Sequence, residues 1–223
     1  MTDRQTFKQR IAAQGVLPLY HHPEEGVAVA IACALYRGGL TCIEYTNRGS
    51  QALSNFTRLV ELRESLFPDA VLAAGTIRNG TDAEAFVDAG ADVLISPVFE
   101  EGVADIAKRY RKLWIPGCMT PTEMHRASRA GFRMVKLFPG NLTGPGYLES
   151  IKPVLPEVEV LVTGGVEPTV ESLGAWFRSG AMAVGMGSRL IPAVFEATDG
   201  ELESLERRAR QLTEMVREAR PAT

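Results

Sequence analysis

A helix end, a glycine and an apolar strand follow one another in the segment Arg129-Ala130-Gly131-Phe132-Arg133-Met134-Val135-Lys136-Leu137-Phe138-Pro139. The glycine is typical of the residue just after a helix, where the backbone turns into the left-handed region at no steric cost. The apolar run behind it predicts a buried strand. Lys136 interrupts that run, so the same segment predicts both a helix-to-strand connection and an unusual lysine.

The same order of elements recurs along the chain and predicts eight strands. A helix end and a glycine precede four of the apolar runs, at Leu40–Tyr45, Ala91–Ser96, Phe132–Leu137 and Ala181–Met186. Turn or helix-cap residues follow four further apolar runs, at Val16–Tyr20, Ala70–Gly75, Leu113–Gly117 and Val158–Thr163. Near-continuous apolar strands that alternate with helices indicate parallel pairing in a buried sheet.

Helical patterns fill the gaps between these strands, at Glu24–Tyr36, Ala52–Leu66, Thr81–Ala89, Glu101–Lys112 and Pro121–Ala130. Eight alternations predict an α/β fold of one domain, residues 1–223, as a closed (β/α)8 barrel of the TIM type. An N-terminal helix near Thr6–Ala13 is expected to close its bottom, and Glu201–Arg220 to form a final helix. An open doubly wound sheet is the alternative, disfavoured because no Gly-x-Gly-x-x-Gly turn follows the first strand.

Composition narrows the class of partner and the compartment. The chain has 223 residues, 45% of them hydrophobic, and a formal charge of −3. Its arginines are scattered, which argues against nucleic-acid and membrane surfaces and favours small-molecule partners. Met1–Gln5 has no apolar signal-peptide core, and the odd number of cysteines suits reduced thiols, so a cytoplasmic protein is expected. The histidines show no metal-ligand spacing, and no metal or cofactor is expected.

Lys136 is the most informative single residue, because a charged amine is disfavoured in an apolar strand. Desolvation favours its neutral form, which is a nucleophile of the kind that forms Schiff bases with carbonyl compounds. Two simpler interpretations remain open at this point. The amine can extend to solvent at the strand end, or it can pair with a carboxylate.

In a barrel of this kind, catalytic groups lie at the carboxyl ends of the strands. Glu44 and Lys136 belong to the second and sixth predicted strands, which share layers of the interior, so they can face each other across the mouth. Glu44 can instead merely neutralise Lys136. Other polar residues have simple alternatives as well: Arg48 as an exposed loop cation, Thr76 and Thr163 as helix caps, Ser96 and Cys118 as packing residues.

The loops after the last two predicted strands differ from these, because their glycines are harder to explain by packing. Gly164 and Gly165 follow the seventh strand, and Ser188 follows the eighth. Helix starts expected near Pro168 and Ser188 would present backbone amides to an anion. Phosphate groups often bind at these two loops in the barrel fold.

Together these motifs resemble the 2-keto-3-deoxy-6-phosphogluconate and 4-hydroxy-2-oxoglutarate aldolase family. The resemblance covers most of the chain and rests on Gly39–Arg48, Ala74-Gly75-Thr76, Ile95-Ser96-Pro97, Pro116–Glu123, Val135–Pro139 and Thr163-Gly164-Gly165. It implies a class I aldolase that cleaves a 2-keto-4-hydroxy acid to pyruvate and an aldehyde. A homotrimer is also implied.

The resemblance assigns a role to each site residue. Lys136 would be the Schiff-base lysine and Glu44 the general acid/base. The pyruvate-derived end would be held by Arg48 and Thr76, and Thr163 would line the site. The distal phosphate would be bound by Gly164, Gly165 and Ser188.

The chain departs from the common family pattern at Tyr45, Asn47, Arg189 and Pro139-Gly140-Asn141. The identity of the aldehyde therefore stays open. Two other functions stay open as well: a sugar-phosphate isomerase or epimerase with Glu44 as base, and a non-catalytic phosphosugar-binding barrel. Neither would form a covalent adduct through Lys136.

Overall fold

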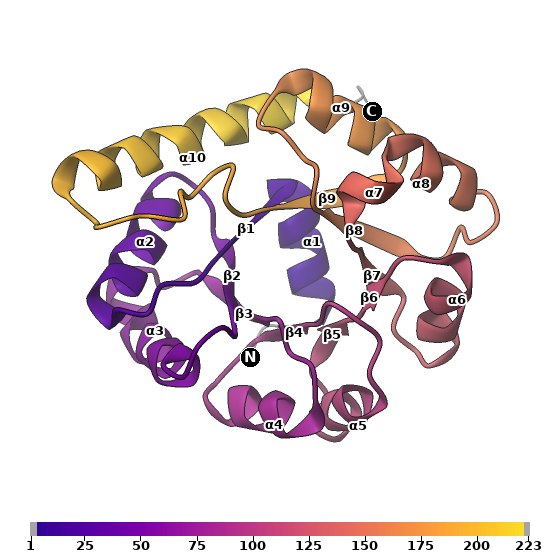
Figure 1. Cartoon of the computed structure of the whole chain (residues 1–223), viewed down its shortest axis with the longest axis horizontal. Coiled ribbons are helices and arrows are strands. Elements are labelled where there is room, and N and C mark those ends of the chain that lie inside the picture. Colours follow the sequence, from indigo (N-terminus) through magenta and orange to yellow (C-terminus); the bar gives the residue numbers. More distant parts are fainter. Residues whose placement is uncertain (1–3, 221–223) are drawn as a thin grey trace.

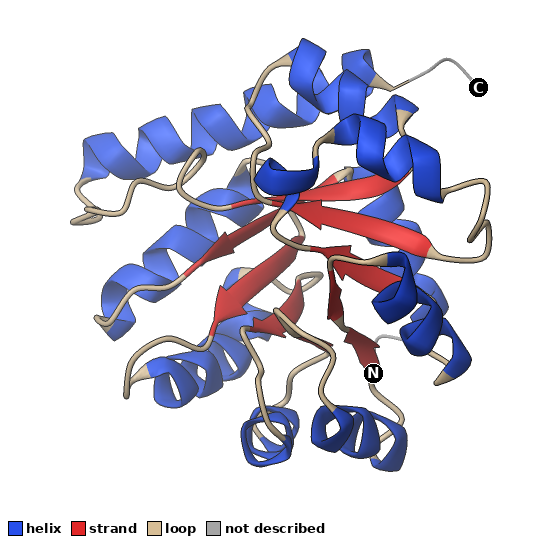
Figure 2. Cartoon of the chain, turned by 45° about the vertical axis from the view of Figure 1, so that its right-hand side comes forward, coloured by secondary structure: helices blue, strands red, loops and turns tan. Residues whose placement is uncertain are grey.

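A ring of parallel strands surrounded by helices forms the molecule in a computed structural model that describes residues 4–220. Expectations that concern residues 1–3 and 221–223 lie outside this range. Within it the strands are β1 (Val16–Tyr20), β2 (Cys42–Thr46), β3 (Val71–Gly75), β4 (Val93–Ile95), β5 (Leu113–Ile115), β6 (Gly117–Cys118), β7 (Met134–Leu137), β8 (Glu159–Thr163) and β9 (Ala181–Met186). Figure 2 shows the strands at the centre with helices around them.

The helices in the described range are α1 (Arg4–Gln14), α2 (Glu25–Arg37), α3 (Ala52–Leu66), α4 (Gly80–Asp88), α5 (Glu101–Arg109), α6 (Pro121–Arg129), α7 (Gly140–Thr143), α8 (Pro145–Ile151), α9 (Val170–Arg178) and α10 (Asp199–Ala219). The long α10 packs along α2 and α9 and completes the outer ring (Figure 1). No helix among residues 4–220 is both long and apolar enough to cross a membrane.

The strand order confirms the predicted barrel and corrects one strand. All pairs are parallel and run in the order β5-β4-β3-β2-β1-β9-β8-β7-β6. The single strand expected over Leu113–Gly117 is divided at Pro116, which has no backbone N–H to donate to a ladder. Ile115 pairs with Ile95 of β4, whereas Gly117 pairs with Lys136 of β7. One stretch of chain thus joins both ends of the sheet and closes the ring.

The four glycines expected after helices adopt the predicted conformation. Their φ angles are 91° to 99°, in the region that glycine enters without strain, at Gly39, Gly90, Gly131 and Gly180. Two other expectations were wrong or incomplete. A helix was expected near Ser188, but that segment makes a single turn on the carbonyl of Gly187, and the next helix begins at Asp199. The alternation predicts a helix between the sixth and seventh predicted strands without giving its bounds, and the structure has the two short helices α7 and α8 there.

The barrel interior is filled from the bottom by apolar side chains. Phe7 and Ile11 of α1 are almost completely buried and pack among the inward-facing residues of the strands, which confirms that α1 closes this end. Gln14 fixes α1 in place, because its side-chain amide bonds to the backbone of Cys42 and of neighbouring residues. Since side chains alternate between faces along a strand, the next inward-facing level lies two residues further along each strand.

Candidate active site

A buried lysine and a buried glutamate occupy that next level of the interior. Glu44 lies two residues beyond the inward-facing Cys42, and Lys136 lies two residues beyond Met134. The amine Nζ of Lys136 is 3.6 Å from Oε1 of Glu44, and the side chains are 7% and 0% exposed. The structure therefore brings together the two residues that the sequence predicted to face each other.

The Glu44 carboxylate lacks the hydrogen bonds that a purely structural buried ion pair needs. Neither of its oxygens accepts a hydrogen bond from a described residue, although both are buried. The 3.6 Å separation from Lys136 is longer than a hydrogen bond. A buried ion pair that only stabilises a fold needs its remaining lone pairs satisfied. This pair instead leaves both carboxylate oxygens available to a bound molecule or water.

Two glycines on neighbouring strands make room for the polar side chains of this level. A Cβ atom on Gly75 would lie 2.0 Å from Oε1 of Glu44, and one on Gly185 would lie 2.3 Å from Oγ1 of Thr163. Gly75 lies on β3 beside β2, and Gly185 lies on β9 beside β8. Glu44 and Thr163 can therefore occupy these positions because the neighbouring residues are glycines, which have no side chain.

Since the sequence analysis expects Glu44 to act as a general acid/base, Gly75→Ala is expected to lower turnover by about 100-fold, the cost of misplacing such a group by about 1 Å. The alanine methyl group would displace the buried Glu44 carboxylate, because its Cβ would lie 2.0 Å from Oε1. The measurement is kcat for pyruvate release from a 2-keto-4-hydroxy acid, together with thermal unfolding. Gly26→Ala is the matched control, because a Cβ atom there would meet nothing within 4 Å. Equal activity of the two variants would contradict the positioning role of Gly75.

A cavity of about 580 Å³ opens next to this pair at the carboxyl ends of the strands. Its size suits a small-molecule ligand. Five of the eight predicted site residues line it: Arg48, Thr163, Gly164, Gly165 and Ser188. Lys136, Glu44 and Thr76 do not line it, but the cavity-lining Leu19 pairs in register with Glu44. Glu44 thus lies immediately beside a cavity-lining strand residue.

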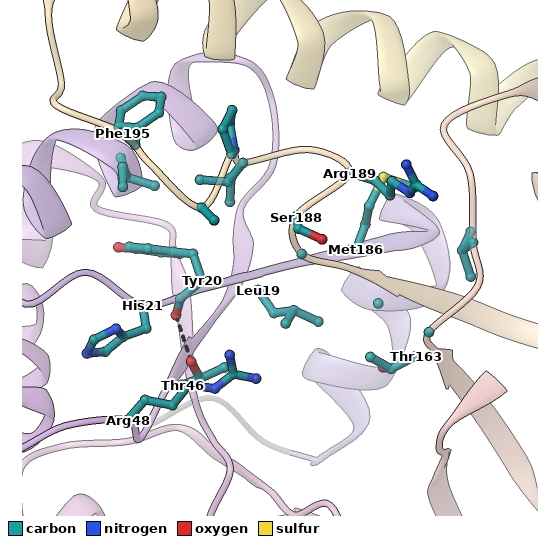
Figure 3. Close-up of a pocket in the computed structure, with 18 of the residues that line it drawn as sticks. Leu19, Tyr20, His21, Thr46, Arg48, Thr163, Met186, Ser188, Arg189 and Phe195 are labelled. Carbon is teal, nitrogen blue, oxygen red and sulfur yellow. Dashed lines mark hydrogen bonds between the residues drawn. The ribbon is translucent and has the colours of Figure 1, made fainter. Parts of the chain in front are cut away.

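The cavity has polar groups on two sides (Figure 3). Arg48 lies on one side, and Thr163 and Ser188 lie on the other. Arg48 is exposed and forms no ion pair with a carboxylate among residues 4–220. Burial and then the charge of Arg48 lower the pKa of the nearby His21, which favours its neutral form. Within the described part of the chain, Arg48 is therefore a cavity-lining cation whose charge no carboxylate neutralises.

The structure removes the capping interpretation of the two threonines. The cap of α4 is Asn79 and the cap of α9 is Thr169, so neither Thr76 nor Thr163 caps the helix that follows it. Thr76 has a φ of 60°, which costs a residue other than glycine about 1–3 kcal/mol and is common at functional sites. The hydroxyl of Thr163 is buried without a hydrogen-bond partner among the described residues.

Ser96 and Cys118 are packing residues, as the sequence indicated. The hydroxyl of Ser96 accepts the indole N–H of Trp114 at 2.8 Å inside the core. Burial raises the pKa of the Cys118 thiol to about 12, with a further contribution from the charge of Glu123. A thiol with this pKa is almost entirely protonated at neutral pH and is a poor nucleophile.

The departures at Tyr45 and Asn47 do not line the cavity themselves. The Tyr45 hydroxyl donates to the carbonyl of His22 at 2.8 Å, and its ring packs against Tyr20 in the outer core. Asn47 donates to the carboxylate of Asp82 at 3.2 Å. Three further cavity-lining residues, His21, Asn141 and Glu167, were not assigned to the site by the sequence analysis. Each lies soon after a strand, which was the available signal, but that position alone does not show which way a side chain points.

Comparison with known proteins agrees with this geometry. A family model described as KDPG and KHG aldolase matches residues 7–205, which is most of the chain. The chain belongs to this aldolase family. The 2-dehydro-3-deoxy-6-phosphogalactonate aldolase of Escherichia coli strain K12 is 33% identical over 154 residues, covering 69% of this chain and 70% of the relative.

Two solved structures of the aldolase family resemble this chain closely. The 2-keto-3-deoxy-6-phosphogluconate aldolase of Zymomonas mobilis ZM4, solved with 3-phosphoglycerate, is 26% identical with a TM-score of 0.80 and covers 92% of this chain and 95% of its own. The KDPG aldolase of Legionella pneumophila, solved with pyruvate as a covalent carbinolamine, is 25% identical with a TM-score of 0.77 and covers 94% and 95%. These relatives are lyases, which supports neither the isomerase nor the non-catalytic alternative.

Proposed function

We propose that the chain is a Schiff-base, class I aldolase that reversibly cleaves a 2-keto-4-hydroxy acid to pyruvate and an aldehyde. The observation that carries this proposal is the Lys136 amine beside a buried Glu44 carboxylate whose oxygens accept no hydrogen bond from residues 4–220. An amine next to a base and a ligand cavity is the arrangement that imine chemistry requires. The carbinolamine of pyruvate named for the Legionella pneumophila relative supports the same chemistry.

In the proposed reaction, the neutral amine of Lys136 attacks the C2 ketone, and uptake of one proton from solvent with loss of water gives a protonated imine; the same proton is released when the imine is hydrolysed at the end. Glu44 then takes the proton of the C4 hydroxyl, and the electrons of the C3–C4 bond move into the imine. The aldehyde leaves, and an enamine remains on Lys136. Glu44 returns its proton to C3, and water hydrolyses the imine to free pyruvate. General acid/base help of this kind contributes roughly 10²–10⁴-fold.

The cavity residues supply binding at the two ends of the substrate. Arg48 would hold the keto-acid carboxylate by charge-assisted hydrogen bonds, with Thr76 beside it, and so present C2 to the amine. Thr163 would contact the reacting part of the substrate. Gly164, Gly165 and Ser188 would bind a distal phosphate, and the 3-phosphoglycerate named for the Zymomonas mobilis relative supports a phosphorylated aldehyde.

The direct test is pyruvate release from three substrates: 2-keto-3-deoxy-6-phosphogluconate, its galactonate epimer and 4-hydroxy-2-oxoglutarate. Pyruvate is measured by coupling to lactate dehydrogenase. We expect release from at least one phosphorylated substrate. Release from none of the three would contradict the proposed activity.

The proposal includes the homotrimer implied by the resemblance. Four large apolar side chains are exposed on the segments that follow β4, β6 and β7, the last of them in α7: Val98, Met119, Phe138 and Leu142. Exposed apolar surface of this kind supports contact with another protein. Sedimentation equilibrium is expected to give three times the 24.2 kDa mass of one chain. A single-chain mass at all concentrations would contradict the trimer.

A further inference from the structure

An ion pair spans the rim of the cavity on the side of the proposed phosphate site. Nη2 of Arg189 is 2.8 Å from Oε1 of Glu167, and both residues line the cavity. Glu167 belongs to the loop after β8, close behind Gly164 and Gly165, and Arg189 follows Ser188 in the loop after β9. In Figure 3 the Arg189 side chain extends from its loop toward the segment that follows β8.

The two arginines that line the cavity differ in whether a carboxylate neutralises their charge. Arg48 has no carboxylate partner among the described residues, whereas Arg189 is neutralised by Glu167. Both members of the rim pair are open to solvent, with side chains 64% and 45% exposed. Exposed ion pairs of this kind are weak and exchange partners readily.

A phosphate placed at Ser188 and the glycine pair would meet both charges of the rim. It carries close to two negative charges at neutral pH and forms strong, often bidentate hydrogen bonds with a guanidinium. It would attract Arg189 and repel Glu167, since all of these groups lie around one end of the cavity. The two rim residues therefore have opposite effects on a distal anion.

We propose that Arg189 is a specificity-determining residue that leaves Glu167 and binds the distal phosphate of the substrate. Glu167 acts as a competing internal anion in the empty site. This inference rests on the proposed aldolase function and specifies its substrate class as aldehydes that carry a terminal phosphate dianion. A neutral or singly charged end would compete less well with Glu167 and would be discriminated against.

The test uses Arg189→Met and Glu167→Gln separately, because the two variants are expected to act in opposite directions. Arg189→Met should raise KM for the phosphorylated substrate by roughly tenfold, the effect of losing one charge-assisted hydrogen bond. Glu167→Gln should lower KM by about two- to fivefold, since it frees Arg189 from an exposed pair. The kcat values should change little. Inorganic phosphate, titrated by calorimetry, should show the same opposite shifts in Kd without any turnover.

The Arg109–Glu84 pair is the matched control. Its side chains are 64% and 41% exposed, and it joins α5 to α4 outside the cavity lining. Arg109→Met and Glu84→Gln should leave KM and the phosphate Kd unchanged. Shifts of Arg189→Met and Glu167→Gln in the same direction, or no shift in either, would overturn the inference. Absence of phosphate binding by the unmodified protein would overturn it too.

Failure of this inference is separable from failure of the proposed function. Formation of a pyruvate imine involves no distal anion, so borohydride should trap pyruvate equally on the unmodified protein and on both rim variants. Trapping with no opposite shifts would remove the role of Arg189 and keep the aldolase. Absence of trapping on the unmodified protein would remove the proposed aldolase function itself.

Discussion

Lys136→Arg is expected to abolish aldol cleavage, with kcat lower by on the order of 10⁵-fold or more, as for loss of a covalent nucleophile. Arginine keeps a positive charge beside Glu44, but a guanidinium stays protonated and cannot form an imine with a ketone. The effect therefore separates imine chemistry from a purely electrostatic role.

The measurement is pyruvate release over long incubations, with thermal unfolding to show that the variant folds. Lys112→Arg is the control, because Lys112 is a partly buried lysine that donates to the carbonyl of Ala91 at 2.6 Å, before β5 at the other end of the barrel. We expect this control to keep full activity. Substantial turnover by Lys136→Arg would exclude the Schiff-base mechanism.

Glu44→Gln is the second large effect, with cleavage slowed by roughly 10²–10⁴-fold, the usual contribution of a general acid/base. Glutamine keeps the shape of the side chain, which is confined beside Gly75, but it does not accept the C4 hydroxyl proton. Formation of the pyruvate imine on Lys136 should persist. A slow cleavage step with retained trapping is therefore the expected pattern.

Single-turnover kinetics with the phosphorylated substrate separate the two steps, and borohydride trapping reports the imine. Glu84→Gln serves as the control for replacement of a carboxylate outside the site. An unchanged cleavage rate in Glu44→Gln would remove Glu44 from the acid/base role. Loss of trapping as well as cleavage would assign Glu44 to imine formation instead.

The strands and their order were predictable because the barrel buries both faces of each strand. Apolar runs mark the strands in the sequence, and a glycine such as Gly131, whose φ is 95°, marks the end of the preceding helix. Pro116 marked a possible break in the sequence, but the change of neighbouring strand there was not predictable, because the apolar run continues through it. The helix expected near Ser188 failed for a related reason: one hydrogen-bonded turn on Gly187 resembles a helix start in sequence.

The central pair of the site was predictable, and its surroundings were not. Glu44 and Lys136 could be inferred to meet, since strand alternation and barrel layers fix which residues point inward. The contact of Gly75 with Glu44 depends on the register between β2 and β3, and no local sequence pattern predicts that register. The Arg189–Glu167 pair depends on the paths of two loops, so the sequence marked Arg189 only as a departure from the family pattern and did not predict its partner.

The most direct test of the central claim is to incubate the protein with pyruvate and borohydride, then to measure the intact mass and map the modified peptide. The account predicts one reduced pyruvate adduct per chain, located on Lys136 and absent from Lys136→Arg. No adduct, or an adduct confined to another lysine, would contradict it.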